Sequence, residues 1–213
     1  MVDKIKQQNK NYQKEALKHF RLSITDAKLA YTLFKSLYQS RTESIVGKEL
    51  FDKYFWVQKQ HNDFFKMAEY CAVNTFMVKI LHGFDNNERA LTLRDIDKNA
   101  YTKFINKKEN KQVLEKIKEL RDKVVAHFDK KQPIEKKLPS FEEIDRFFIN
   151  LQDFYNNLSR KIENSKTNFE QDKKFRRELE IVLQNLYIGR KIRLLENELK
   201  WDWEKNPKKI SAK

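Results

Sequence analysis

The sequence predicts an all-α protein, an up-and-down bundle of five to six helices, and three observations support this fold class. Only 3 of the 213 residues are glycine and 3 are proline, and a β-rich chain needs many of both for its tight turns. Apolar side chains recur every three or four positions, which is the period of an amphipathic helix. Acidic and basic residues alternate between them, as on solvated helix faces. We therefore expect one helical domain over residues 1–213, with most of its 16 phenylalanines in the core.

The N-terminal half contains two long helical patterns. The first covers about residues 12–38, and the second covers about 42–81 with a break allowed near His61. The single cysteine, Cys71, lies among apolar residues of the second pattern, and we expect it to fill the core. One cysteine cannot form an internal disulfide, which fits a reducing compartment.

The middle of the chain contains two further elements. After a loop over residues 83–87, a short helix is expected with Thr92 as its N-cap and Asp95 at its third position. A longer helix follows over about 110–128. Residues 129–139 contain two prolines and several lysines, and we expect them to form an exposed loop.

The C-terminal part opens with the clearest helix start. Ser140 and Glu143 form an S-x-x-E capping box, in which each side chain accepts a hydrogen bond from a free backbone N–H. This helix continues to about Ile162. A last helix is expected over about 168–199, followed by a frayed basic tail over 204–213. The apolar positions of the last helix predict either more core or a docking surface for a partner: Phe175, Leu179, Val182, Leu186 and Leu194.

The net charge of +14 favours partners with a negative field, chiefly RNA, DNA or an anionic membrane surface. The alternative origin of this charge is the lysine- and asparagine-rich composition that an AT-rich genome produces. The most apolar run, residues 70–81, is interrupted by Asn74 and Lys79 and is too short to span a membrane. The N-terminal residues are rich in lysine and carry no signal-peptide pattern. We therefore expect a soluble, cytoplasmic protein without membrane contact.

The spacing of the four histidines argues against a metal site. No two of them lie at i, i+4, and no C-x-x-C pattern accompanies them. Three scattered glycines leave no phosphate-binding loop. We expect neither a metal nor a cofactor.

One pattern can carry chemistry, the pair Arg121 and His127 near the end of the predicted 110–128 helix. The apolar stripe of this helix consists of Val113, Ile117, Leu120 and Val124. Arg121 and His127 fall on opposite flanks of the stripe, roughly 120° apart around the axis and about 9 Å apart along it. Histidine titrates near neutral pH and can move the proton of an RNA 2′-hydroxyl. Arginine can bind the phosphate and stabilise the charge of the transition state.

Each chain supplies only one arginine and one histidine, which are few groups for a catalytic site. Two chains that bring their pairs together would form a more complete site. A structural role is the alternative for both residues. A histidine near a helix C-terminus interacts favourably with the helix dipole. Arg121 can extend its charged end to solvent or pair with Glu115, Glu119 or an acid on another helix.

Residues 120–129, with the sequence LRDKVVAHFD, resemble the R-x4-6-H signature of HEPN domains, the nucleotide-binding helical domains of higher eukaryotes and prokaryotes. A polar residue commonly follows the arginine in that family, and Asp122 does so here. The upstream segment Leu91-Thr92-Leu93 resembles the lead-in of the abortive-infection branch. With the helical organisation, the resemblance covers about residues 15–165.

The resemblance implies a homodimer whose two motifs face one cleft, and a metal-independent endoribonuclease of phage defence or of a toxin–antitoxin pair. By position, Arg121 would bind and stabilise the phosphate, His127 would move protons, and Asp122 would orient Arg121 or the RNA. RNA is the implied substrate, and an antitoxin protein is a further candidate partner. Some members of the family lack activity, so a non-catalytic module that binds nucleic acid or protein is the alternative.

Overall fold

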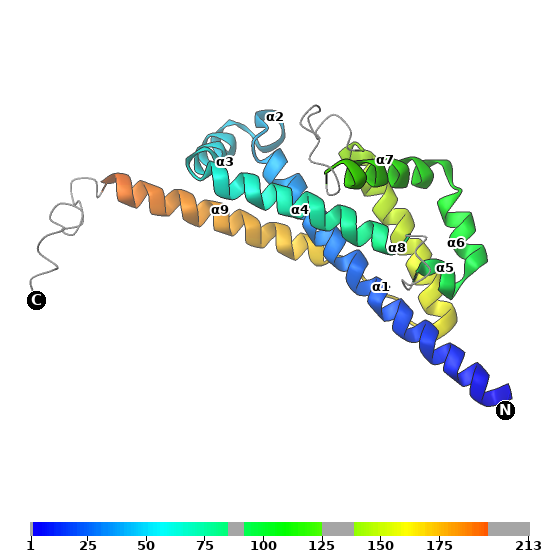
Figure 1. The fold of residues 1–213 in the computed structure, drawn as a ribbon. Helices are drawn as coiled ribbons and strands as arrows, with labels where there is room; N and C mark the ends of the chain where they lie inside the picture. The colour runs from blue at the N-terminus through cyan, green and yellow to red at the C-terminus, as the bar shows by residue number, and fades with distance from the viewer. Residues whose placement is uncertain (1, 85–91, 125–138, 196–213) are drawn as a thin grey trace, which may run out of the picture.

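The computed structural model describes residues 2–84, 92–124 and 139–195, and within these ranges every regular element is an α-helix (Figure 1). The predicted all-α class is confirmed. The helices are α1 (Val2–Gln39), α2 (Glu43–Val46), α3 (Lys48–Gln60), α4 (Asn62–His82), α5 (Leu93–Ile96), α6 (Lys98–Ile105), α7 (Lys108–Val124), α8 (Phe141–Glu163) and α9 (Gln171–Leu195). Figure 1 shows the start of α1 and the end of α9 extending beyond the bundle in opposite directions.

The described ranges contain nine helices where five to six were predicted, because local breaks divide the predicted 42–81 helix. Gly47 has a φ of +80°, a conformation that glycine adopts without penalty, and it separates α2 from α3. His61, with φ −113° and ψ 41°, separates α3 from α4. The predicted break near His61 is therefore confirmed, whereas the break at Gly47 was not predicted.

Two short helices fill the corner before α7. The Asp95 carboxylate accepts hydrogen bonds from the backbone N–H and the hydroxyl of Thr92, at 2.8 and 3.0 Å, which closes the first turn of α5 as predicted. Asp97 then accepts from the backbone N–H of Ala100 at 2.9 Å and begins α6. The sequence analysis did not predict α6, since its eight residues are too few for a clear helical period.

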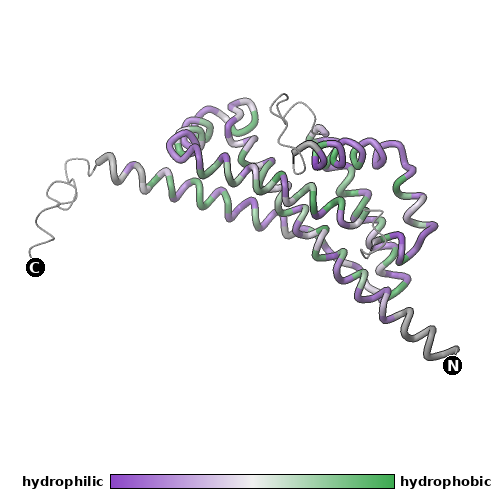
Figure 2. Tube along the Cα trace, viewed as in Figure 1, coloured by the Kyte–Doolittle hydropathy of each residue, from purple (hydrophilic) through white to green (hydrophobic). Residues whose placement is uncertain are grey.

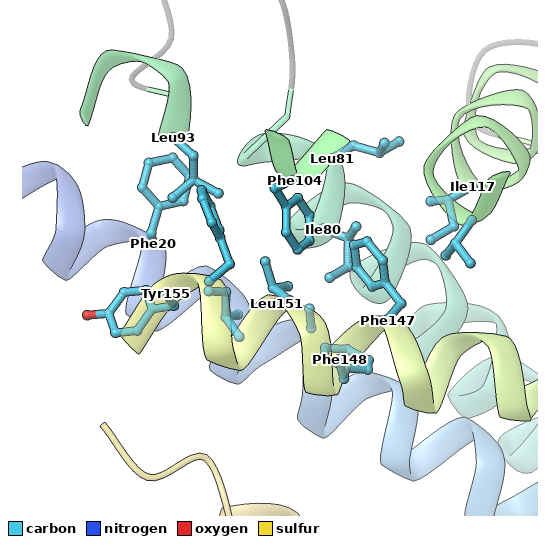
Figure 3. Close-up of a cluster of buried hydrophobic side chains, with 14 of the residues drawn as sticks. Phe20, Ile80, Leu81, Leu93, Phe104, Ile117, Phe147, Phe148, Leu151 and Tyr155 are labelled. Atoms are coloured by element: carbon cyan, nitrogen blue, oxygen red, sulfur yellow. The ribbon is translucent and has the colours of Figure 1, made fainter. Parts of the chain in front are cut away.

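The main core lies along α8. The capping box is confirmed at its start: the N–H of Ser140 donates to Glu143 Oε2 at 2.7 Å, and the N–H of Glu143 donates to Ser140 Oγ at 3.2 Å. Figure 3 shows buried side chains of several helices converging on α8. They include Phe20, Ile80, Phe104, Ile117, Phe147, Leu151 and Tyr155. Each fully buried side chain of this size contributes about 1.5–3 kcal/mol.

A second, smaller cluster joins α9 to the bundle. It consists of Leu37, Tyr54, Val57, Phe65 and Leu183, from α1, α3, α4 and α9. Leu179 is partly buried against it, whereas Val182 and Leu186 are 51% and 38% exposed. The apolar positions of the last helix were predicted to serve as core or as a docking surface, and only some of them belong to the core. The structure does not describe the side chain of Leu194.

The outer face of α4 corrects one expectation. Cys71, predicted to fill the core, is exposed. Figure 2 shows hydrophobic positions recurring along α4. They include Phe64 (68% exposed), Met67 (61%) and Val78 (46%) as well as core residues. The prediction for Cys71 was wrong because apolar neighbours in the sequence do not indicate burial on α4, which has apolar side chains on its exposed face as well. None of the described helices is long and apolar enough to cross a membrane.

Candidate active site

The helix that carries the candidate site, α7, is anchored near its start by a buried amide. Asn110 is fully buried, and its Nδ2 donates to the carbonyl of Phe104 at 3.0 Å. Its Oδ1 accepts from Asn150 Nδ2 of α8 at 2.9 Å. Because buried amides are costly when unpaired, these two bonds fix α7 against both α6 and α8.

A buried stripe then sets the rotation of α7 about its axis. Val113, Ile117 and Leu120 are 3%, 0% and 2% exposed and belong to the main core. They are the first three members of the predicted stripe, and the side chain of the fourth, Val124, lies outside the described ones. Arg121 directly follows Leu120 in the sequence, so the buried stripe fixes the position of the Arg121 backbone.

A charged contact ties α7 to the start of α8. Lys116 Nζ donates to both carboxylate oxygens of Glu143, at 2.9 and 3.1 Å. The hydrogen bond from Lys116, followed by that from the backbone of Ser140, lowers the pKa of Glu143 below its ordinary value. The same carboxylate thus caps α8 and holds α7, so the two helices that flank residues 125–138 are tied together.

Arg121 lies on the opposite flank from this contact. At about 100° per residue it is roughly 140° around the helix from Lys116. Its Nε and Nη2 donate to Oδ1 of Asp122 at 3.0 and 2.8 Å. The Arg121 side chain is 25% exposed and that of Asp122 is 53% exposed. The core thus fixes the backbone of Arg121, and the Asp122 carboxylate orients its guanidinium near the protein surface.

The third predicted residue, His127, lies outside the described residues. The distance between Arg121 and His127 is therefore still a prediction. The other histidines lie on other elements: His19 on α1, His61 between α3 and α4, and His82 at the end of α4. Within the described ranges, no group of three or more His, Cys, Asp or Glu side chains is placed to hold a metal ion.

The chain was compared with known protein families. The model of the HEPN family AbiU2 matches residues 74–181, just over half of the chain. The chain belongs to the AbiU2 family of HEPN domains. The predicted resemblance to the abortive-infection branch is confirmed. No curated protein and no solved structure matches the chain.

The part that matches the AbiU2 family begins within α4 and ends within α9. It includes Arg121, Asp122 and the position of His127, whereas α1, α2 and α3 lie before it. The HEPN motif is thus inside the matched part of the chain.

Sequence reasoning missed the residues that hold the motif helix in place. The capping role of Glu143 was predicted from its spacing to Ser140, but its bond to Lys116 spans 27 residues and no local pattern indicates it. The Asn110–Asn150 pair is equally non-local, at a separation of 40 residues. Only the packing of α7 against α8 reveals both contacts.

Proposed function

We propose that this HEPN domain is a metal-independent endoribonuclease that acts in phage defence or as the toxin of a toxin–antitoxin pair. Arg121, Asp122 and His127 form its site, and it needs no cofactor. The single observation that carries the proposal is the Arg121 guanidinium, oriented by Asp122 and set directly after the buried Leu120, inside the part of the chain that matches the AbiU2 family.

In the proposed reaction, the 2′-oxygen of a ribose attacks the adjacent phosphorus while a neutral imidazole of His127 takes the 2′-hydroxyl proton. The bond from phosphorus to the 5′-oxygen breaks, and an imidazolium returns a proton to that oxygen. The products are a 2′,3′-cyclic phosphate and a 5′-hydroxyl. Arg121 stabilises the negative charge that builds up on the phosphate oxygens in the transition state.

The two proton transfers need a base and an acid at one phosphate, and each chain has one His127. We therefore propose a homodimer in which His127 accepts the proton and His127 of the partner subunit donates one. Each subunit would also supply an Arg121 for the same phosphate. The net charge of +14 supports affinity for RNA, because cationic side chains that replace condensed counterions favour binding.

The test is cleavage of labelled RNA by the full chain in the presence of EDTA. The wild-type protein should cleave, and both His127→Ala and Arg121→Ala should lose activity by a factor of about 100 or more. Lys118→Ala, an exposed position on the same helix, is the matched control and should cleave like the wild type. Equal cleavage by His127→Ala, or activity only without EDTA, would contradict the proposal.

A non-catalytic role is the second candidate. The charge of +14 supports binding of nucleic acid without cleavage. The exposed apolar residues of α9 support binding of a protein, for example an antitoxin: Ile181, Val182, Leu186 and Ile188. This candidate predicts RNA or protein binding that is unchanged in Arg121→Ala and no cleavage at any salt concentration.

A further inference from the structure

A cavity of about 220 Å³ opens between α1, α8 and α9. It lies on another flank of α8 than the motif helix: Asp145, which lines the cavity, is roughly 160° around α8 from Glu143, which contacts α7. Nothing in the proposed ribonuclease reaction uses it. Its lining includes Tyr31, Lys35, Phe148, Ile149, Gln152 and Arg176.

The inner side of the cavity is rigid and partly aromatic. Tyr31 and Phe148 are 4% and 5% exposed, and their ring centroids are 5.5 Å apart. The Tyr31 hydroxyl lies 2.9 Å from Asp145 Oδ1 and 3.0 Å from the carbonyl of Phe141. The tyrosine therefore joins α1 to the first turns of α8 and gives the cavity a fixed wall.

Four of the five charged residues that line the cavity neutralise one another in pairs. Lys35 Nζ lies 2.6 Å from Asp145 Oδ2, and Lys28 Nζ lies 3.4 Å from Asp172 Oδ1. Lys28 also donates to the carbonyl of Phe169 at 2.8 Å. Both lysine side chains are unusually buried, at 14% and 21% exposed, so these pairs are part of the cavity wall.

The fifth charge is the Arg176 guanidinium. Neither Arg176 nor the carboxamide of Gln152 makes a hydrogen bond or ion pair within the described part of the chain. Burial, followed by the charge of Asp145, raises the pKa of Tyr31 far above its ordinary value, and the charge of Arg176 acts in the opposite direction. Arg176 and Tyr31 both line the cavity.

These features define the ligand. A net positive charge disfavours a cation, and paired ions on two walls disfavour a purely apolar molecule. The volume of the cavity is larger than one phosphate group needs, and Phe148 and Ile149 provide an apolar surface beside Arg176 and Gln152. An anionic head with a small organic body satisfies all of these conditions.

We propose that this cavity binds a small organic anion, whose phosphate or carboxylate group is held by Arg176 and Gln152 and whose body lies against Phe148 and Ile149. The Lys28 and Lys35 ammonium groups add to the positive field from the walls. Because the three lining helices are α1, α8 and α9, a bound anion also holds α9 against the bundle.

Isothermal titration of the full chain tests the proposal with four probes: ribose 5-phosphate, AMP, inorganic phosphate and succinate. We expect at least one of the organic anions to bind, and more tightly than inorganic phosphate. The phosphate probes and succinate distinguish a phosphate head from a carboxylate head. Arg176→Gln should weaken binding at least tenfold, and Gln152→Leu should weaken it further in the double variant.

Arg177→Gln is the matched control, because Arg177 is the exposed neighbour on α9 and does not line the cavity. It should bind like the wild type. Saturating anion should also raise the melting temperature of the wild type and of Arg177→Gln, and not that of Arg176→Gln.

Absence of binding by every probe, or equal affinities of Arg176→Gln and Arg177→Gln, would overturn the assignment. RNA cleavage with EDTA is measured on the same variants. Because Arg176 is not part of the motif helix, cleavage that persists without anion binding, or binding without cleavage, separates the failure of one proposal from that of the other.

Discussion

At the scale of single residues, Asp122 has a position that allows its effect on Arg121 to be measured without loss of stability. It is half exposed, and its carboxylate accepts two hydrogen bonds from the neighbouring guanidinium. Exposed ion pairs contribute only about 0–1 kcal/mol to folding. Its removal therefore acts on the orientation of Arg121 and leaves the helix intact.

Asp122→Asn should lower the rate of RNA cleavage by about tenfold to a hundredfold, because a misplaced catalytic group loses rate on this scale. Its melting temperature should equal that of the wild type. Asp153→Asn, at an exposed position on α8, is the control for loss of one negative charge. An Asp122→Asn protein with unchanged cleavage would show that Asp122 does not orient the arginine.

Asn110 has the opposite character, since it is fully buried and makes two hydrogen bonds. Asn110→Ala removes both hydrogen bonds, and the truncation leaves a cavity in the core. The Asn150 amide loses its acceptor, which costs about 1–3 kcal/mol, whereas the Phe104 carbonyl keeps the bond from the Lys107 backbone N–H. We expect urea denaturation to show a loss of at least about 2 kcal/mol. Asn157→Ala, at an exposed position on α8, should change the free energy of unfolding by less than about 0.5 kcal/mol.

At the scale of elements, two glycines show how much the backbone conformation contributes to the free energy of unfolding. Gly47 lies at the break between α2 and α3, and Gly189 lies inside α9. A Cβ at either Gly47 or Gly189 meets no atom within 4 Å, so sterics with neighbours play no part. Gly47 has φ +80°, which is strained for alanine, and Gly189 lies inside α9.

Gly47→Ala should therefore destabilise the protein by about 1 kcal/mol, and Gly189→Ala should stabilise it by about 0.5–1 kcal/mol. Thermal or urea unfolding of the two variants beside the wild type gives the two signs. Shifts of the same sign would show that one of these backbone conformations is assigned wrongly.

The start of α8 has a pH dependence that follows from Glu143. Its pKa is lowered in the folded protein by Lys116 and by the backbone of Ser140. The stability from this carboxylate is therefore complete above its unfolded pKa of about 4.3 and is lost as the pH falls through the lower folded value.

Glu143→Ala should cost about 1 kcal/mol at neutral pH, and the difference from wild type should shrink in acid. Denaturation at a series of pH values from 7 down to 3 measures it. Glu142→Ala, which removes the exposed neighbouring acid from the same first turn, should show little difference at any of these pH values.

These elements also show what a sequence can predict. The starts of α5 and α8 were predicted because their caps are local, with both partners within three residues. The exposure of Cys71 was not predicted, because it depends on which helices cover α4. The cavity between α1, α8 and α9 was equally hidden, since Lys28, Asp145 and Arg176 are over 100 residues apart at their widest and follow no shared period.

At the scale of the whole molecule, the charge of +14 should make the proposed RNA binding sensitive to salt. Affinity for single-stranded RNA should fall steeply between 50 and 200 mM salt, with a log–log slope of about −0.7 for each phosphate neutralised. Fluorescence anisotropy with a labelled RNA measures this slope. His127→Ala should keep both the affinity and the slope, and a salt-independent affinity would exclude the charge as the main source of binding.

The predicted helical class and the HEPN motif both come from local sequence, whereas the proposed sharing of a site between two subunits would depend on the surfaces that pair the two chains. The sequence indicated that a pair of residues on opposite flanks would need a partner to form one site. It could not indicate how α7 is anchored, because the anchors Asn150 and Glu143 belong to another helix.

The Lys116–Glu143 contact has a consequence for how such proteins can diversify. It joins the middle of α7 to the first turn of α8, so a contact outside residues 125–138 helps to hold these two helices together. Doubling the length of a connection costs only about 0.6 kcal/mol in chain entropy. Changes in the length of the chain between Arg121 and the start of α8 should therefore cost little folding free energy, while those between Arg121 and His127 would change the spacing of the proposed site.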